Sequence, residues 1–320
     1  MGELALTNTP YDDVFRTLMN DCSSLIIPVI NEVFGEEYTG DEEIVFSSNE
    51  HFLNRQDGQE IEKITDTTFK VIGDEIKKYH WECQSAADNS MLVRFFEYDT
   101  QIALDEGEVT EDILTVTFPH SAVLYLRCNK TTPDKLKIKM ITSGGTVTYH
   151  IEAMKCQNYT LEEIFAKNLL FLLPFYIFSH EGNFKVYEQD ETKLEELKLE
   201  YARIRNELEK LLQKGNINEY TKCTIIDMSN KVLEHIAQKY ESVKEGVKSV
   251  MGGKVLEYEA KTIREEGREE GREEGREEGR EEGIRGTVSV LKDLGIPIQT
   301  IWSKIQEEYK LSPESCKKYL

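Results

Sequence analysis

The chain contains 320 residues, of which 39% are hydrophobic, enough for roughly two domains of about 150 residues with at least one substantial core. This composition excludes a disordered protein. The 39 basic and 60 acidic residues give a net charge of −21, so attraction of a polyanion by overall charge is excluded and nucleic-acid binding must depend on local chemistry.

Neither membrane insertion nor export is indicated by the sequence. The longest apolar run, Leu169 to Phe178, contains Pro174 and is much shorter than the about 20 residues that span a bilayer. Residues 1–10 lack the basic and then apolar order of a secretory signal, so we expect a cytoplasmic protein without membrane contacts. The six cysteines include no C-x-x-C pair, which favours reduced thiols over a zinc site or a disulfide framework.

The first elements are predicted to be helices, followed by a β-hairpin. Apolar residues recur at helical spacing from Tyr11 to Phe34, and Pro28 is expected to split this segment into two short helices. Side chains alternate between two faces from Thr65 to Ile72. Gly73 and Asp74 predict a turn, and a second strand is expected from Lys77 to Gln84.

A helix and further strands are predicted after this hairpin. Helical spacing returns from Asn89 to Leu104, and Ala122 to Leu126 is an apolar run typical of a buried strand. Leu136 to Ile151, interrupted by Gly144 and Gly145, predicts another hairpin. The order strand, strand, helix, strand indicates an α/β core, and a further helix is expected from Thr160 to Leu173.

The globular domain is expected to end near Glu188 and thus to span residues 1–188. Residues 189–260 predict a helical extension that packs back on the domain or dimerises. Its amphipathic helices are expected over Glu191 to Lys214 and Asn230 to Lys248, joined through Gly215 and Asn216.

The tetrapeptide Arg-Glu-Glu-Gly occurs five times in succession from Arg264 to Gly283. It has no apolar seam for a coiled coil, and each glycine disfavours a helix by about 1 kcal/mol relative to alanine. Residues 261–283 are therefore predicted to form a partly helical, solvated spacer, with a specific binding element as the alternative. The tail, residues 284–320, contains two short helical patterns, one around Ile298 to Tyr309 and one that is capped by Ser312 before Pro313 and runs to the C-terminus. Glu307 and Glu308 argue against a DNA-binding helix-turn-helix there.

One segment departs from the acidic composition of the chain. Residues 127–139 carry a local charge of +4, because five basic side chains accompany Asp134 alone. This strip is able to face phosphates, or it is a solvated edge strand that lysines keep from pairing with other chains. The basic residues are Arg127, Lys130, Lys135, Lys137 and Lys139.

Two acids of the first predicted hairpin form the most informative pattern. Asp66 lies on its first strand and Glu82 on its second, where Cys83 and Gln84 follow. If the strands are adjacent and antiparallel, both carboxylates are able to converge on a divalent ion, with the Cys83 carbonyl as a further ligand. Such hard oxygen ligands suit Mg²⁺ or Mn²⁺. The alternative is that both acids are ordinary exposed strand residues in a chain with 60 acids.

The residues around these acids resemble the signature of PD-(D/E)xK nucleases, in the form found in Rpn-type recombination-promoting nucleases and transposases. The likeness is carried by Ile64-Thr65-Asp66, by Lys70-Val71-Ile72-Gly73 and by His80-Trp81-Glu82-Cys83-Gln84-Ser85. It extends along nearly the whole chain. Further similar segments are 12–16, 91–98, 123–126, 132–134, 173–176 and 251–254, together with the Arg-Glu-Glu-Gly array.

The resemblance implies a restriction-endonuclease-like mixed sheet flanked by helices, with metal-dependent endonuclease activity on DNA. Asp66 and Glu82 would bind Mg²⁺ or Mn²⁺, and Asp12 on the first helix would be the third catalytic acid. The family likeness also suggests a role in recombination or phage defence, and a homodimer that nicks both strands. No small-molecule cofactor is expected.

Two departures from the signature bear on catalysis. Thr65 replaces the proline before Asp66, which mainly affects entry into the strand. Gln84 stands where the signature has the lysine that orients the attacking water and stabilises the charged transition state. A glutamine is able to hydrogen-bond water and phosphate but carries no charge. Lys70, on the same strand face as Asp66, or Lys63 would have to take its place in space.

Three nearby residues have two interpretations each. Arg94 and Tyr98, one helical turn apart, form a DNA phosphate clamp or anchor the helix. His80 is more typical of a half-buried strand histidine than of a general base. The alternative to an enzyme is a DNA- or protein-binding module that keeps the nuclease fold while catalysis has weakened through Gln84.

Overall fold

The structure is a computed structural model that describes residues 10–46, 50–54, 60–64, 67–85, 90–252, 272, 275, 276, 279–281, 283–311 and 313–319. The chain divides into two compact units, Met1–Lys261 and Thr262–Leu320. Asp66 of the predicted metal site and most of the Arg-Glu-Glu-Gly array lie outside the described residues.

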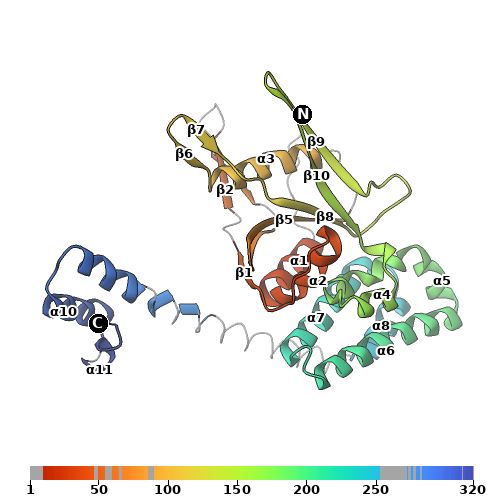
Figure 1. The fold of residues 1–320 in the computed structure, drawn as a ribbon. Coiled ribbons are helices and arrows are strands. Elements are labelled where there is room, and N and C mark those ends of the chain that lie inside the picture. Colours follow the sequence, from red (N-terminus) through yellow and green to blue (C-terminus); the bar gives the residue numbers. More distant parts are fainter. Residues whose placement is uncertain are drawn as a thin grey trace. The chain divides into compact units, whose positions relative to one another are not determined.

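A six-stranded mixed sheet forms the centre of the first unit (Figure 1), which confirms the predicted α/β class. The strand order is β1-β4-β5-β8-β10-β9, in which β8 pairs in parallel with both β5 and β10 while the other neighbours are antiparallel. The short pairs β2–β3 and β6–β7 form separate sheets. The strands are β1 (Glu43–Phe46), β2 (Glu50–Asn54), β3 (Glu60–Ile64), β4 (Thr67–Ile72), β5 (Ile76–Gln84), β6 (Glu108–Thr110), β7 (Ile113–Thr115), β8 (His120–Tyr125), β9 (Lys135–Thr142) and β10 (Gly145–Lys155).

Both hairpins expected in the sheet are present. β4 and β5 pair antiparallel in a register that joins Thr67 to Trp81 and Ile72 to Ile76. β9 and β10 pair from Lys135 with Glu152 to Thr142 with Gly145. The β8 strand is buried along most of its length, as its apolar run predicts.

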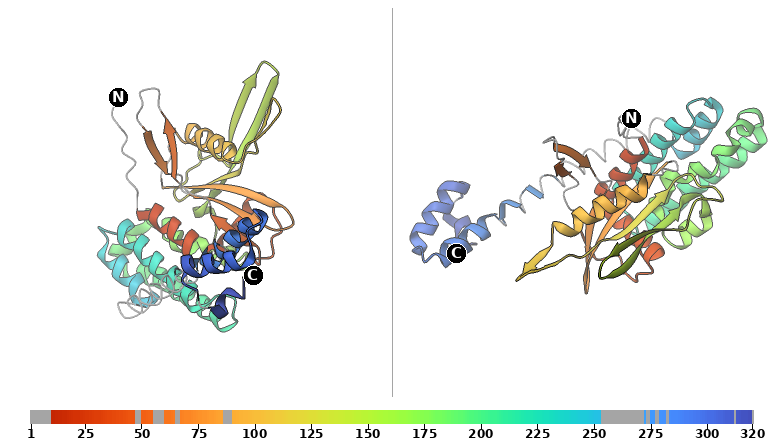
Figure 2. Two further views of the ribbon diagram at one scale, coloured as in Figure 1. Left: turned by 90° about the vertical axis from the view of Figure 1, so that its left-hand side faces the viewer. Right: turned by 90° about the horizontal axis from the view of Figure 1, so that it is seen from above.

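Helices cover both faces of this sheet (Figures 1 and 2). α1 (Pro10–Asp21) and α2 (Ile26–Phe34) pack on one face, where their apolar side chains share the main core with Tyr79 and Trp81 of β5. α3 (Met91–Leu104) covers the other face, and its Phe95 packs with Val123 of β8. Burial of both sheet faces against helices explains why β8 reads as a nearly continuous apolar strand.

The break between the first two helices is not at Pro28, so that part of the prediction was wrong. The chain turns after Asp21, and a short 3₁₀ turn, η1 (Ser23–Leu25), separates α1 from α2. Pro28 instead lies in the first turn of α2. A proline is tolerated there because the first backbone N–H groups of a helix have no intrahelical partner.

From the end of β10 to Met251 the chain forms a series of α- and 3₁₀-helices joined by short turns. Thr160 caps α4 in a capping box with Glu163, as predicted, but α4 ends at Ala166 rather than Leu173. The left-handed conformation of Asn168 (φ 56°) stops it, and a 3₁₀ segment follows. The elements are η2 (Cys156–Asn158), α4 (Leu161–Ala166), η3 (Leu170–Ser179), η4 (Glu181–Asn183), α5 (Phe184–Gln189), α6 (Glu191–Gln213), α7 (Glu219–Ile236) and α8 (Glu241–Met251).

The helices α6 to α8 pack back on the sheet domain. Leu208 of α6, Ile225 of α7 and Val243 of α8 are fully buried in the same apolar cluster as Phe15 of α1 and Trp81 of β5. The single helix expected over Asn230 to Lys248 is wrong, because the chain leaves the helix between α7 and α8.

The second unit is a small helical assembly. Residues 283–293 are helical, and α10 (Ile298–Tyr309) and α11 (Pro313–Cys316) follow, which confirms the helix expected over the same residues as α10. Its core consists of Ile284, Val288, Ile301, Ile305 and Cys316. Within the described parts of the chain, none of the helices combines the length and apolar character that crossing a membrane requires.

Candidate active site

The candidate site lies on β5, on the sheet face that α3 covers. Side chains alternate along the strand, so that Tyr79, Trp81 and Cys83 enter the main core while His80 and Glu82 face α3. Glu82 is only 3% exposed. A carboxylate in such a position must be compensated by hydrogen bonds or opposite charge, because burial strongly disfavours an isolated anion.

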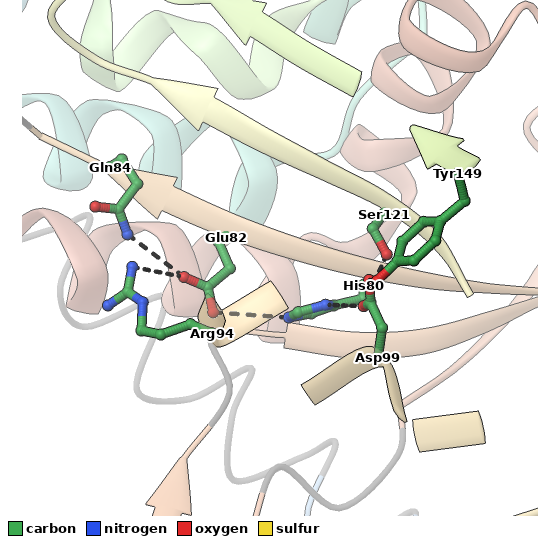
Figure 3. A network of polar contacts seen from close by, with 7 residues as sticks. All are labelled: His80, Glu82, Gln84, Arg94, Asp99, Ser121 and Tyr149. Carbon is green, nitrogen blue, oxygen red and sulfur yellow. Dashed lines mark hydrogen bonds and ion pairs between the residues drawn. The ribbon is translucent and has the colours of Figure 1, made fainter. Parts of the chain in front are cut away.

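Two residues from different elements hold one oxygen of Glu82 (Figure 3). The Arg94 guanidinium of α3 donates to Oε2 of Glu82 at 3.1 Å, and the side-chain amide of Gln84 donates to the same oxygen at 3.4 Å. The sequence-predicted residues Glu82, Gln84 and Arg94 are therefore brought together. Gln84 and Arg94 are only partly buried, so solvent reaches this end of the site.

A wholly buried pair continues the network behind Glu82. Nδ1 of His80 lies 2.7 Å from Oδ1 of Asp99 on α3, and Nε2 of His80 lies 3.7 Å from Oε1 of Glu82. Asp99 also accepts hydrogen bonds from the Ser121 hydroxyl of β8 at 2.8 Å and from the Tyr149 hydroxyl of β10 at 3.3 Å. Figure 3 shows these groups as a chain that runs from Tyr149 through Asp99 and His80 to Glu82.

The two carboxylates decide the charge of His80. Burial lowers the pKa of this imidazole, but the Asp99 hydrogen bond and the nearby Glu82 carboxylate outweigh it and raise the pKa to about 9. At neutral pH His80 is thus an imidazolium. With Arg94 on one side and His80 on the other, the two buried acids are balanced by two positive groups.

Asp66, the other predicted metal ligand, lies outside the described residues. Its neighbour Thr67 is the first described residue of β4 and pairs with Trp81, the residue before Glu82. Among the residues that the structure describes, no three His, Cys, Asp or Glu side chains form a group that could hold a metal ion.

Asp12, the predicted third acid, is on α1 and therefore on the opposite side of the sheet from α3. In the described part of the chain, the structure gives no contact between Asp12 and Glu82. The start of α1 nevertheless lies near the end of β5, because Arg127 donates to the Ser85 carbonyl at 3.0 Å and lies over the Tyr11 ring at 5.8 Å.

Lys70, considered as a substitute for the missing signature lysine, is engaged elsewhere. It forms an ion pair of 2.7 Å with Glu106, which also binds Lys78 at 2.9 Å. In the hairpin register Lys70 pairs with Lys78, four residues before Glu82. Glu106 follows the C-terminal end of α3, so the structure places this lysine away from Arg94 and Glu82.

The remaining predicted residues, Tyr98 and Cys83, lie beside the network. The Tyr98 ring is 3% exposed and packs edge-on against His80, with 6.0 Å between ring centroids. The thiol of Cys83 is buried in the main core, on the other face of β5. The carbonyl of Gln84 accepts from Leu126 N beside β8, and because successive carbonyls of a strand point to opposite edges, that of Cys83 points toward β4.

Asp99, Ser121 and Tyr149 were not predicted from the sequence as site residues. One signal was present for Asp99, because it falls on the buried helical stripe formed by Met91, Phe95 and Ile102. An acid on such a stripe requires a buried partner. The partners come from β8 and β10, and local spacing does not reveal which residues of distant strands meet α3.

Comparison of the chain with known protein families, with curated proteins and with solved structures found no match. The likeness to Rpn-type nucleases is carried by the sequence motifs alone.

Proposed function

We propose that this protein is a Mg²⁺-dependent DNA endonuclease of the PD-(D/E)xK class, with a restriction-endonuclease-like core and the Rpn and transposase type of motif. The observation that carries the proposal is the buried Glu82 carboxylate, with Gln84 and Arg94 on its solvent side. This strand is paired with β4, which follows Asp66 directly in the chain. The arrangement corresponds to the acid, spacer and polar residue of the family signature.

The donors at this strand end suit a hard divalent cation. Glu82 would supply a carboxylate oxygen, the Cys83 carbonyl points toward the neighbouring strand, and Asp66 would supply the second carboxylate. When bound, Mg²⁺ would lower the pKa of an attacking water and neutralise charge that develops on the phosphate. The cation would compete with Arg94, because both are positive and both require the Glu82 carboxylate.

The proposed roles of the other residues follow from their exposure and charge. The Arg94 side chain is 20% exposed, so its guanidinium is able to turn from Glu82 to a phosphate oxygen of the DNA. Gln84 would hydrogen-bond the attacking water or the phosphate. Asp12 is proposed as an additional acid that approaches from the start of α1, and Tyr98 as support for the His80 ring.

Nicking of supercoiled plasmid DNA tests this function. The wild-type protein is expected to nick with Mg²⁺ or Mn²⁺ and to lose all activity in EDTA. Asp66→Ala and Glu82→Ala should each abolish nicking, because each removes a ligand. Glu108→Ala, an exposed acid on β6, is the matched control and should cut like the wild type. Nicking that persists in both ligand variants refutes the site assignment.

A second candidate function is favoured by one observation at the same site. Glu82 is held by an arginine and a glutamine, and among the described residues no lysine contacts it, since Lys70 is paired with Glu106. The chain would then be a DNA- or protein-binding module that keeps the nuclease fold. That function predicts retardation of DNA in a gel without cleavage under any divalent cation.

The biological setting, recombination or phage defence, shares this chemistry. Toxicity on expression that disappears with Glu82→Ala would favour nuclease action in the cell over an inactive module.

A further inference from the structure

The β9–β10 hairpin extends beyond the rest of the sheet as a two-stranded ribbon (Figures 1 and 2). β10 pairs with β9 from Gly145 to Glu152, but it pairs with β8 only from Glu152 to Lys155. Among the strands that the structure describes, none therefore pairs with residues 145–151 or with their partners on β9 from the other side. An exposed ribbon of this kind has two faces with different side chains.

One face of the ribbon is apolar and faces α3. Leu136, Ile138 and Tyr149 pack against the cluster that includes Phe95 of α3. The alternate residues, Lys135, Lys137 and Lys139, must then point to the opposite face. His150 lies opposite Lys137 there, and Thr148 lies opposite Lys139.

The lysines of this outer face differ in their ion pairs. Lys135 is bound to Glu152 at 2.8 Å, whereas Lys137 and Lys139 are exposed and have no acidic partner within the described chain. Farther back in the basic strip, Arg127 is held by Glu181 at 2.6 Å. Lys130, in the turn that leads into β9, is likewise exposed without an acidic partner in the described chain, so the uncompensated charge of the strip lies on the ribbon and in this turn.

The lysines of β4 and β5 in the same sheet, by contrast, all have acidic partners. Lys70 and Lys78 bind Glu106, and Lys77 binds Glu36 at 2.7 Å, although the chain as a whole carries −21 and carboxylates are abundant. Exposed lysines on an edge strand also prevent edge-to-edge pairing. That role requires charge at the edge, but it does not require two lysines in line on one face beside His150.

We propose that the outer face of the β9–β10 ribbon, defined by Lys137, Lys139 and His150, is a second DNA-binding surface that grips the phosphates of a duplex. Alternate residues of a strand are about 6.8 Å apart, which equals the axial separation of alternate phosphates in one DNA strand, at about 3.4 Å each. A two-stranded ribbon also fits the major groove, which is about 12 Å wide. This face is turned away from α3 and Glu82, so the ribbon would anchor DNA without taking part in cleavage.

Fluorescence anisotropy of a labelled DNA duplex, with the full-length protein in EDTA, tests the proposal. Lys137→Gln combined with Lys139→Gln is expected to weaken binding about tenfold or more near 0.1 M salt, and to reduce the slope of log K against log salt by about 2. The matched control, Lys214→Gln with Lys239→Gln, removes the same charge at exposed positions of the helical region and should bind like the wild type.

The results that overturn the proposal are equally specific. Wild-type affinity for DNA in the Lys137→Gln, Lys139→Gln variant (the ribbon variant) overturns it. An equal loss of affinity in the control variant also overturns it, because that loss would show a general effect of charge. The surface belongs to another ligand if the wild type binds duplex RNA or anionic lipid vesicles more tightly than DNA, and if the ribbon variant loses that binding but keeps its affinity for DNA.

This inference shares with the proposed function only the choice of DNA as substrate. DNA binding that depends on the ribbon, without cleavage under any cation, would refute the nuclease while the ribbon surface stands. Metal-dependent cleavage by the wild type, together with unaltered DNA binding by the Lys137→Gln, Lys139→Gln variant, would refute the ribbon surface while the nuclease stands.

Discussion

At the residue scale, the chain of buried charges behind Glu82 determines what the site tolerates. Asp99 and His80 are completely buried; Nδ1 of His80 is hydrogen-bonded to Asp99, whereas Nε2 faces the Glu82 carboxylate at 3.7 Å. A buried ion pair contributes little net stability when intact, but removing one partner leaves an uncompensated charge. The network therefore fixes the position of Glu82 on β5 and makes its members hard to replace.

Replacing Asp99 by alanine is expected to destabilise the fold strongly. The change leaves the His80 imidazole without its hydrogen-bond acceptor and also removes the acceptor of the Ser121 hydroxyl. A loss of about 3 to 5 kcal/mol in the free energy of unfolding is expected, measured by urea denaturation. Glu108→Ala should leave the denaturation midpoint unchanged. A midpoint for Asp99→Ala equal to that of the wild type would contradict the network.

The elevated pKa of His80 predicts a pH dependence of stability in metal-free buffer. The folded state raises the pKa from 6.5 to about 9 and so favours the imidazolium. The stabilisation is complete below pH 6.5 and is lost as the pH rises through about 9, with a total of roughly 3 kcal/mol. The difference in unfolding free energy between wild type and His80→Asn should therefore shrink over this range. A difference that is constant between pH 6 and pH 9.5 would contradict a charged His80.

The partners of Glu82 could be predicted from the sequence only where they are local. Gln84 shares its strand face through the two-residue period of β5, and Arg94 was recognised as part of a family-like helix. Asp99 meets His80 because α3 crosses β5, and Ser121 and Tyr149 reach it from two other strands. Such contacts depend on tertiary packing, which residue spacing alone does not specify.

At the scale of elements, the helical region is part of the sheet domain rather than an appendage. α6 has an exposed and a buried side, and the buried side includes Leu197, Ile204 and Leu208 in the main core. Its amphipathic pattern was visible in the sequence, but the pattern left open whether the helix packs back or dimerises.

A pair of leucines on α6 tests this packing. Leu208 is fully buried, whereas Leu199 on the same helix is 68% exposed. Leu208→Ala is expected to lower the free energy of unfolding by about 2 to 5 kcal/mol, because it removes buried methyl groups and leaves a cavity in the core. Leu199→Ala should change stability little, as judged from thermal or urea unfolding. Equal effects of the two substitutions would mean that α6 does not share the core.

The break between α7 and α8 shows why some element boundaries escape sequence patterns. No glycine or proline lies between Ile236 and Glu241. The start of α8 is instead fixed from α5, where Glu188 accepts hydrogen bonds from the backbone and the hydroxyl of Ser242, and Tyr240 packs on Phe184 at 5.4 Å. Helix ends that depend on such distant caps have no local signal.

At the scale of the whole molecule, the charge of −21 and the proposed substrate are opposed. Long-range repulsion weakens any encounter with DNA, so binding must arise where positive groups are locally uncompensated. In the described chain, we propose the ribbon lysines as one such position, and Arg94 as a second once its guanidinium turns from Glu82 to a phosphate. A bound divalent cation would add positive charge at Glu82 and further reduce the repulsion.

If Glu82 and Asp66 together bind one divalent cation, calorimetric titration of the full-length protein with Mn²⁺ will detect that ion. We predict saturable binding of about one ion per chain to the wild type and to Glu108→Gln. Glu82→Gln and Asp66→Asn should each lose this binding while they remain folded. Binding of the ion by Glu82→Gln and Asp66→Asn with the affinity of the wild type would contradict a cation site shared by these two carboxylates.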